Sequence, residues 1–264
     1  EKISKIGTQP IIGTQINFKY GDTTGLLPLF SLNEEGYQRI IKLSSFSFLD
    51  NDVLSDPHIN FEDLLNDMEG VAIFSGTIFG LFGQLFDKGK FTEIDDLYKK
   101  IKSTFGDRFY LEIQRHNDQN ELGFEKFNLK KSLELEIPII ATNEVFYLNK
   151  DMHEAHDALI CIGRKTYVND KSRTKFSDQH YFKTNSEMTE LFSDIPEALE
   201  NNYNFPLRCN FRPLFSNPIL PNISSEKDGK AEEILKKDSL HGLRIKFDKI
   251  FGTKPNELEN NKTF

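Results

Sequence analysis

The sequence has few of the residues on which small secreted proteins and many zinc proteins depend. Only two cysteines, Cys161 and Cys209, occur among 264 residues, and tryptophan is absent. Two thiols exclude a disulfide framework and a zinc site built on cysteines. No apolar run reaches the roughly 18 residues of a membrane span, and no signal-peptide pattern opens the chain. We therefore expect a cytoplasmic protein that works without a membrane.

The charge balance is acidic. Lysine and arginine number 33 against 41 aspartates and glutamates, which gives a formal net charge of −8. This balance argues against nucleic-acid binding through bulk charge, although a local basic groove is compatible with it. The hydrophobic and aromatic fractions, 38% and 12%, are too high for a disordered chain. The length allows one large domain or two ordinary ones.

Strand patterns alternate with helix patterns from residue 10 to residue 141. Strands are expected at 10–18, 26–32, 71–74, 109–114 and 137–141, and helices at 33–48, 61–68, 92–106 and 124–136. This alternation favours a parallel α/β sheet or barrel. In such folds the functional residues lie at the carboxyl ends of the strands.

The second half of the chain is different. Helices are expected at 152–162, 187–192 and 195–209, and a long charged helix at 231–251. We divide the chain into a domain at 1–215, a linker at 216–230 and the start of another region at 231–264. Because the chain starts at Glu1 and stops within a polar stretch, we interpret it as a fragment of a longer polypeptide.

Polar residues follow several of the expected strands. Gln114 and His116 follow the strand at 109–114, and Asn143 and Glu144 follow the strand at 137–141. A histidine at a strand end is a candidate ligand or general base. The alternative, that His116 fixes a loop through hydrogen bonds, stays open.

A second group of candidates lies on the helix expected at 152–162. His153, His156 and Asp157 have the spacing i, i+3, i+4, which places them on one helix face. Two imidazoles and a carboxylate at this spacing can hold Zn²⁺ or Mn²⁺, although a hydrogen-bonding cluster would show the same pattern. The remaining histidines are expected at the surface; they are His58, His180 and His241.

Residues 164–175 are strongly basic, with three lysines and two arginines. They are candidates for phosphate contacts, although such a run is often only a solvated face. The sequence gives no sign of exposed aromatic side chains among these basic residues, so we expect no stacking platform for bases. Phosphate-cradling glycine loops and a nucleophile elbow are also absent from the sequence.

Several blocks, in order, are more specific than any of these motifs. They are PIIG at 10–13, NEEGY at 33–37, LEIQRH at 111–116, PIIATNEVFYL at 138–148, EAHDALICI at 154–162, IPEALEN at 195–201 and PILP at 218–221. Together they resemble the PHP region of the bacterial DNA polymerase III alpha subunits. The resemblance implies an α/β fold, a distorted (β/α)₇ barrel of PHP type. The family's first strand would precede Glu1, so the barrel would lack it, and helices and a linker toward the polymerase palm would follow.

The resemblance also implies a function for the longer protein. That protein would be a DNA-directed DNA polymerase of chromosome replication, using Mg²⁺ held by palm carboxylates beyond Phe264. This segment alone would not polymerise DNA. Its expected partners are the other holoenzyme subunits, among them a proofreading exonuclease, and DNA through the longer protein.

The resemblance implies that the metal site of the PHP region is degenerate in this chain. Gln15 stands where metal-binding members have a glutamate, and the family's NDVH motif reads NEVF, with Glu144 for the aspartate and Phe146 for the histidine. A phenylalanine cannot ligate a metal ion. We therefore expect no metal in this segment, which would act as a scaffold and docking module. The alternative function is that of a stand-alone, metal-dependent phosphoesterase of the PHP superfamily.

Overall fold

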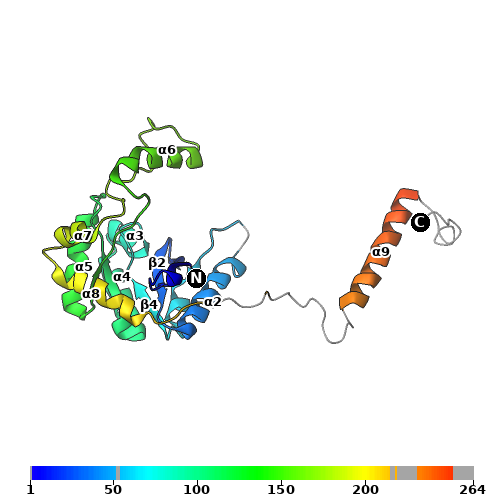
Figure 1. Cartoon of the computed structure of the whole chain (residues 1–264), viewed down its shortest axis with the longest axis horizontal. Coiled ribbons are helices and arrows are strands. Elements are labelled where there is room, and N and C mark those ends of the chain that lie inside the picture. Colours follow the sequence, from blue (N-terminus) through cyan, green and yellow to red (C-terminus); the bar gives the residue numbers. More distant parts are fainter. Residues whose placement is uncertain (1, 52–53, 215–217, 219–230, 252–264) are drawn as a thin grey trace. The chain divides into compact units, whose positions relative to one another are not determined.

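The computed structural model describes residues 2–51, 54–214, 218 and 231–251 (Figure 1). Contacts divide the chain into two units, residues 1–213 and 214–264, and each is described by itself. The first unit holds the sheet and all candidate residues. In the second unit the described helix is α9, Ala231–Phe251, at the position expected from the sequence. The predicted linker at 216–230 lies, apart from residue 218, outside the described residues, and the domain boundaries stay a prediction.

Six strands form one sheet in the first unit. They are β1 (Gly13–Tyr20), β2 (Thr23–Ser31), β3 (Ile59–Asn60), β4 (Val71–Phe74), β5 (Phe109–Ile113) and β6 (Ile139–Ala141). Their order in the sheet is β3-β1-β2-β4-β5-β6. Strands β4, β5 and β6 are parallel neighbours, and β3 is parallel to β1. The α/β class expected from the sequence is confirmed, and the sheet is consistent with a PHP-type barrel. The absence of a first strand stays a prediction.

The sheet is mixed and not uniformly parallel, which differs from the alternation argument. Strand β2 pairs antiparallel with both β1 and β4. Only Gly21 and Asp22 connect β1 to β2, and a connection this short permits only an antiparallel pair. Gly21 has a φ of +58°, a conformation that glycine adopts at little cost in such turns.

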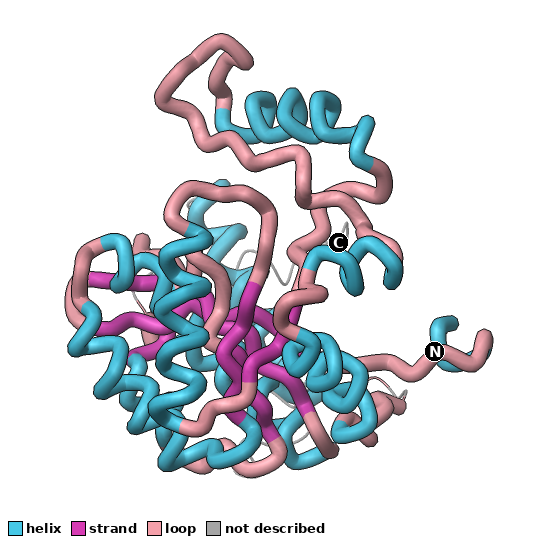
Figure 2. The backbone as a smooth tube through the Cα atoms, turned by 90° about the vertical axis from the view of Figure 1, so that its left-hand side faces the viewer, coloured by secondary structure: helices cyan, strands magenta, loops and turns pink. Residues whose placement is uncertain are grey.

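Helices cover the sheet, as the tube view shows (Figure 2). Their bounds are α1 Lys2–Lys5, α2 Glu34–Leu49, α3 Leu81–Asp87, α4 Phe91–Phe105, α5 Glu121–Leu135, α6 His153–Arg164, α7 Asn185–Leu191 and α8 Pro196–Arg208, with 3₁₀ turns at Phe61–Leu65, Gly106–Arg108 and Lys150–Met152. Helix α2 begins at Asn33, whose side chain accepts a hydrogen bond from the Gly36 N–H, as expected of an N-cap. Helix α3 was not expected from the sequence, because it is short and contains Gly83.

Both faces of the central strands are buried. Along β4, Val71 and Ile73 enter one apolar cluster, whereas Ala72 and Phe74 enter another on the opposite face. This is the alternation of side chains along a strand. Helix α8 covers the second face, where the Phe205 ring lies 5.0 Å from that of Phe74. Such two-sided burial explains why β4 and β5 read as continuous apolar runs.

The phenylalanines of the chain serve largely as core. The Tyr98 ring packs edge-on against Phe82 at 4.8 Å and Phe109 at 5.5 Å, and all three side chains are fully buried. The Tyr98 hydroxyl donates to the Asn128 side chain at 2.9 Å, so the buried polar group is satisfied. These contacts fix α4 and α5 against β5, and thereby the strand end that carries the candidate site.

Between β6 and α7 the chain forms an arm, residues 145–182, which extends beyond the sheet and carries α6 (Figures 1 and 2). At its base the two segments of the arm meet in a parallel bridge between Tyr147 and Tyr181. The Phe182 N–H donates to the Tyr147 carbonyl at 3.0 Å. None of the described helices is long and apolar enough to cross a membrane.

The close approach of α2 to the loop before β4 gives the first prediction. A Cβ added to Gly36 would stand 1.9 Å from the backbone oxygen of Gly70, whereas a Cβ on Gly163 of α6 would meet nothing within 4 Å. We expect Gly36→Ala to lower the free energy of unfolding by at least about 2 kcal/mol, because two backbones must separate. The matched Gly163→Ala variant should be neutral or slightly stabilising, since alanine favours helix. Urea denaturation measures both changes, and equal stabilities would contradict this packing.

Candidate functional site

Parallel pairing brings the carboxyl ends of β4, β5 and β6 to one edge of the sheet. There the Gln114 side-chain amide donates to the Thr142 hydroxyl at 2.9 Å, which joins the ends of β5 and β6. The Ser75 hydroxyl, which follows β4, accepts from the Glu112 N–H at 2.9 Å. Two further strand-end residues singled out from the sequence also meet, since His116 Nε2 lies 3.1 Å from Asn143 Oδ1.

Glu112, inside β5, is a buried carboxyl group. Its Oε1 accepts from Gln114 at 3.0 Å and from the Thr142 hydroxyl, while its Oε2 has no hydrogen-bond partner among the described residues. Burial raises the pKa of Glu112 to about 7, against the lowering effect of the two hydrogen bonds. The nearby Glu144 carboxylate raises it further. Glu112 therefore changes its charge near neutral pH.

Two residues singled out from the sequence line one small cavity. Gln15, on the exposed face of β1, and Glu144 border a space of about 60 Å³ together with Gly76. Burial raises the pKa of the Glu144 carboxyl group. The structure thus brings Gln15 and Glu144 together although 129 positions separate them in the sequence (144 − 15).

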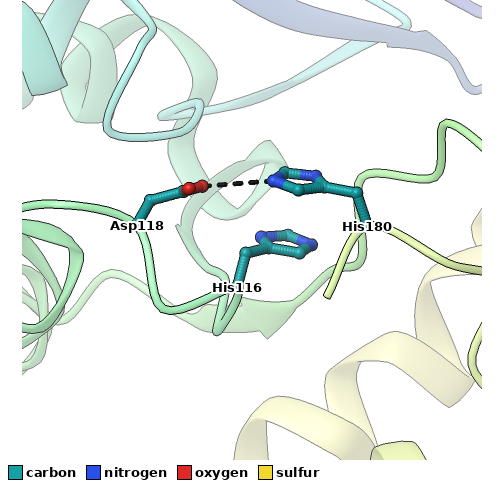
Figure 3. Close-up of side chains that lie close together, drawn as sticks. All are labelled: His116, Asp118 and His180. Carbon is teal, nitrogen blue, oxygen red and sulfur yellow. Dashed lines mark hydrogen bonds and ion pairs between the residues drawn. The ribbon is translucent and has the colours of Figure 1, made fainter. Parts of the chain in front are cut away.

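Next to this cavity lies a cluster of two imidazoles and a carboxylate, made by His116, Asp118 and His180 (Figure 3). The two imidazole rings stack with their centroids 4.1 Å apart and their planes only 2° from parallel. His180 Nε2 lies 3.2 Å from Asp118 Oδ2, and each residue's nearest ligand atom is within 4.8 Å of the others. Both imidazoles are almost completely buried.

Backbone and side-chain acceptors hold the two rings in place. His180 Nδ1 lies 3.2 Å from the Glu144 carbonyl oxygen. A carbonyl and a carboxylate both accept, so either ring nitrogen of His180 can donate to its neighbour. His116 Nε2 lies 3.1 Å from the Asn143 amide oxygen, which also accepts from Lys183 at 3.0 Å. His116 Nδ1 is buried and has no hydrogen-bond partner among the described residues, although Glu121 Oε1 lies 3.4 Å away.

The stacked arrangement is a poor fit to a metal ion. An imidazole nitrogen binds zinc at about 2.0–2.1 Å, along the lone pair that lies in its ring plane. Because His116 and His180 lie in separate parallel planes, one ion cannot lie in both. The cluster can bind a cation only after one ring rotates out of the stack.

Phe146 occupies the space beside these imidazoles. Its ring stacks on His180 at 4.8 Å and on His156 at 5.2 Å, and it meets Phe176 edge-on at 4.8 Å. Burial lowers the pKa of His156. Phe146 is thus an apolar packing element between two histidines.

The candidates on α6 have separate partners. His153 Nε2 lies 3.1 Å from the Phe176 carbonyl oxygen. Asp157 forms a buried bidentate pair with Arg173, with an Nη2–Oδ2 distance of 2.7 Å, and the hydrogen bonds from Arg173 lower the pKa of Asp157. His153, His156 and Asp157 therefore stand on one helix but do not meet at one point within the described part of the chain.

Sequence reasoning missed two members of the histidine cluster. Asp118 lies two residues after His116, and a histidine followed by an aspartate at this spacing is a pattern from which a second ligand could have been predicted. The expectation that His180 is a surface residue is wrong: it is fully buried, because the arm returns its polar loop against β6. His241 is exposed as expected, and His58 is half-buried. No local pattern connects His180 with His116, 64 residues away.

The second correction concerns the basic residues 164–175. An exposed aromatic side chain does stand among them: Tyr167 is 79% exposed. The sequence does not distinguish a tyrosine in a core from one at the tip of a projecting arm, and the arm was not predicted.

The buried carboxyl group gives a prediction on pH dependence. With its folded pKa raised to about 7, Glu112 binds a proton more strongly in the folded protein than in the unfolded chain. The folded state therefore loses stability as pH rises from about 4.5 to 7, by about 3 kcal/mol at most. We expect Glu112→Gln to remove this loss, so its advantage in melting temperature over the wild type should grow between pH 5 and pH 8. A constant difference across this range would contradict the raised pKa.

The sequence of the chain is similar to those of known proteins. A family model for the PHP domain matches residues 1–116, which include β1 to β5 and His116. The DNA polymerase III subunit alpha of Rickettsia bellii is 35% identical over 262 residues, 98% of this chain and 22% of that protein. The corresponding protein of Rickettsia conorii is 36% identical over 97% of this chain and 22% of its own length, and that of Caulobacter vibrioides is 32% identical over 95% and 23%.

The chain thus spans about a fifth of the length of these relatives, while nearly all of it takes part in the match. The order of the motifs, the α/β fold and the PHP match agree with this similarity. The chain is therefore similar over nearly all of its length to DNA polymerase III alpha subunits, and it contains PHP-domain sequence.

Proposed function

We propose that this chain is the PHP segment of an alpha subunit that carries out template-directed DNA synthesis in chromosome replication. Within that protein the segment serves as a scaffold and as a docking module for other subunits. The observation that carries the proposal is Phe146. Its ring fills the space between His156 and His180, where a metal-binding relative would need a ligand.

The other positions support the same function. Gln15 offers a neutral amide, and His180 is engaged by Asp118 and by a backbone carbonyl. We expect this segment to hold no tightly bound metal ion, whereas Mg²⁺ would act at the polymerase centre of the longer protein. The proposed partners are further subunits of the replicase, including a proofreading exonuclease, and DNA; the proposed location is the cytoplasm.

A second candidate function is a metal-dependent phosphoesterase. The convergence of His116, Asp118 and His180 favours it, because two imidazoles and a carboxylate are a common ligand set for zinc. It requires the stacked rings to separate when the ion enters. Two residues argue against it: Gln15 places a neutral amide in the neighbouring cavity, and Phe146 places an apolar ring between His156 and His180.

Metal content distinguishes the two functions. After incubation with Zn²⁺ or Mn²⁺ and desalting, we expect the wild-type chain to retain much less than one ion per molecule. Glu144→Ala should retain equally little, because a position that holds no metal loses none. Elemental analysis by mass spectrometry measures both.

The contrary outcome is specific. The wild type and Glu144→Ala could each retain one ion that His180→Gln loses. This result would identify the histidine cluster as a metal site and would favour the phosphoesterase function. The docking role is tested separately by co-elution with the exonuclease subunit of the same replicase in gel filtration. If the chain and the exonuclease subunit elute separately at micromolar concentrations, the proposed docking role is wrong.

A further inference from the structure

The tip of the arm carries a basic loop, residues 165–175, which follows α6. This loop contributes no residue to the histidine cluster or to the cavity lined by Gln15 and Glu144. We infer that this loop binds the phosphate backbone of single-stranded DNA. The inference deepens the proposed function and rests on it for the choice of DNA, since DNA is the polymer on which the longer protein would act. The evidence for the site itself is the shape, the charge and the exposed aromatic ring of the loop.

Internal hydrogen bonds fix the shape of the loop. Arg173 pairs with Asp157 of α6 through two bonds and donates from Nε to the Val168 carbonyl at 3.0 Å. At the turn, the Tyr167 N–H donates to Asp170 Oδ2 at 2.8 Å and the Asp170 N–H returns to the Tyr167 carbonyl at 3.0 Å. The loop is therefore ordered by its own contacts before any partner arrives, which lowers the entropy cost of binding.

These contacts leave the lysines available. Lys165, Lys171 and Lys175 are all exposed, and none forms an ion pair with a described carboxylate. Arg173 is neutralised by Asp157, which is itself nearly buried. Beside the lysines stands the exposed Arg164, which bonds only to the neutral Thr174 hydroxyl among described residues.

The net charge of the loop differs in sign from that of the whole chain. Four unpaired cations, Arg164 and the three lysines, stand against one carboxylate, Asp170. The whole chain has a formal net charge of −8. A local positive surface on an acidic protein directs a polyanion to one place, because the remaining surface repels it. Lysine ammonium groups bind phosphate oxygens without regard to base sequence.

The aromatic ring selects the kind of polyanion. Tyr167 is 79% exposed and Val168 beside it is 56% exposed, in a turn that follows Lys165 and precedes Lys171. An exposed ring among basic side chains is the surface on which an unpaired base stacks. In a duplex the bases are covered by their neighbours, so only a single strand uses both the ring and the lysines. An acidic protein partner would use the charges but would have no need of Tyr167.

The experiment measures binding of fluorescein-labelled oligo(dT) to the full 264-residue chain by fluorescence anisotropy. We expect the triple variant Lys165→Gln/Lys171→Gln/Lys175→Gln to bind about tenfold more weakly at low salt, and its log–log salt slope to fall by about 2. The matched control, Lys19→Gln/Lys42→Gln/Lys126→Gln, removes three exposed lysines elsewhere in the first unit with the same change of charge. It should bind like the wild type.

A second pair of variants tests the ring. Tyr167→Ala should weaken binding of oligo(dT) severalfold but leave binding of a duplex of the same sequence nearly unchanged, and Tyr167→Phe should restore the affinity. Circular dichroism melts confirm that all variants are folded. The tyrosine side chain makes no hydrogen bond among the described residues, so its truncation should leave the fold intact.

Three outcomes would overturn the inference. They are no measurable binding by the wild-type chain at low salt, an equal loss in the two triple variants, and displacement of oligo(dT) by polyglutamate as effectively as by unlabelled oligo(dT). The last would identify an acidic protein partner instead. None of these results bears on metal content or exonuclease docking, so a failure here is distinguishable from a failure of the proposed function.

Discussion

The parallel pairing of β4, β5 and β6 is the constraint on which the rest of the first unit depends. It aligns the carboxyl ends of three strands, so that Glu112, Gln114 and Thr142 meet although they come from two segments of the chain. The pairing is itself secured by apolar clusters on both faces of the sheet. A doubly buried strand tolerates few polar groups. Within β5 the polar side chains are Glu112 and Tyr110, and the Tyr110 hydroxyl accepts a hydrogen bond from Arg208 at 2.7 Å.

Arg115 connects the end of β5 to the neighbouring helices. It pairs with Glu125 of α5 and with Asp194 beyond α7, and its guanidinium lies 4.9 Å above the Phe192 ring. The hydrogen bonds that Arg115 donates to Asp194 and to Glu125 raise the pKa of its guanidinium above the usual value. One side chain at the end of β5 thereby connects the strand, the following helix and the segment that returns from the arm. The neighbouring His116 is positioned by the same strand end, which is why its surroundings are so well defined.

Much of the fold could be predicted from the sequence, and the site only in part. Apolar runs and caps such as Asn33 located most helices and strands, because their signals are local. The antiparallel β1–β2 pair and α3 were missed, since a two-residue turn and a short helix with Gly83 give weak patterns. Gln114 and Asn143 were found because strand ends are readable. His180 was not, because its burial is decided by the arm, a feature of tertiary structure that no periodicity reports.

Phe146 has a mechanical role that follows from its place between two parts of the fold. Its ring completes a continuous stack that runs from His156 through Phe146 and His180 to His116. His156 lies on α6 of the arm, whereas His116 follows β5 of the sheet. A movement of the arm relative to the sheet would have to separate stacked rings, so the stack couples the position of α6 to that of the strand ends.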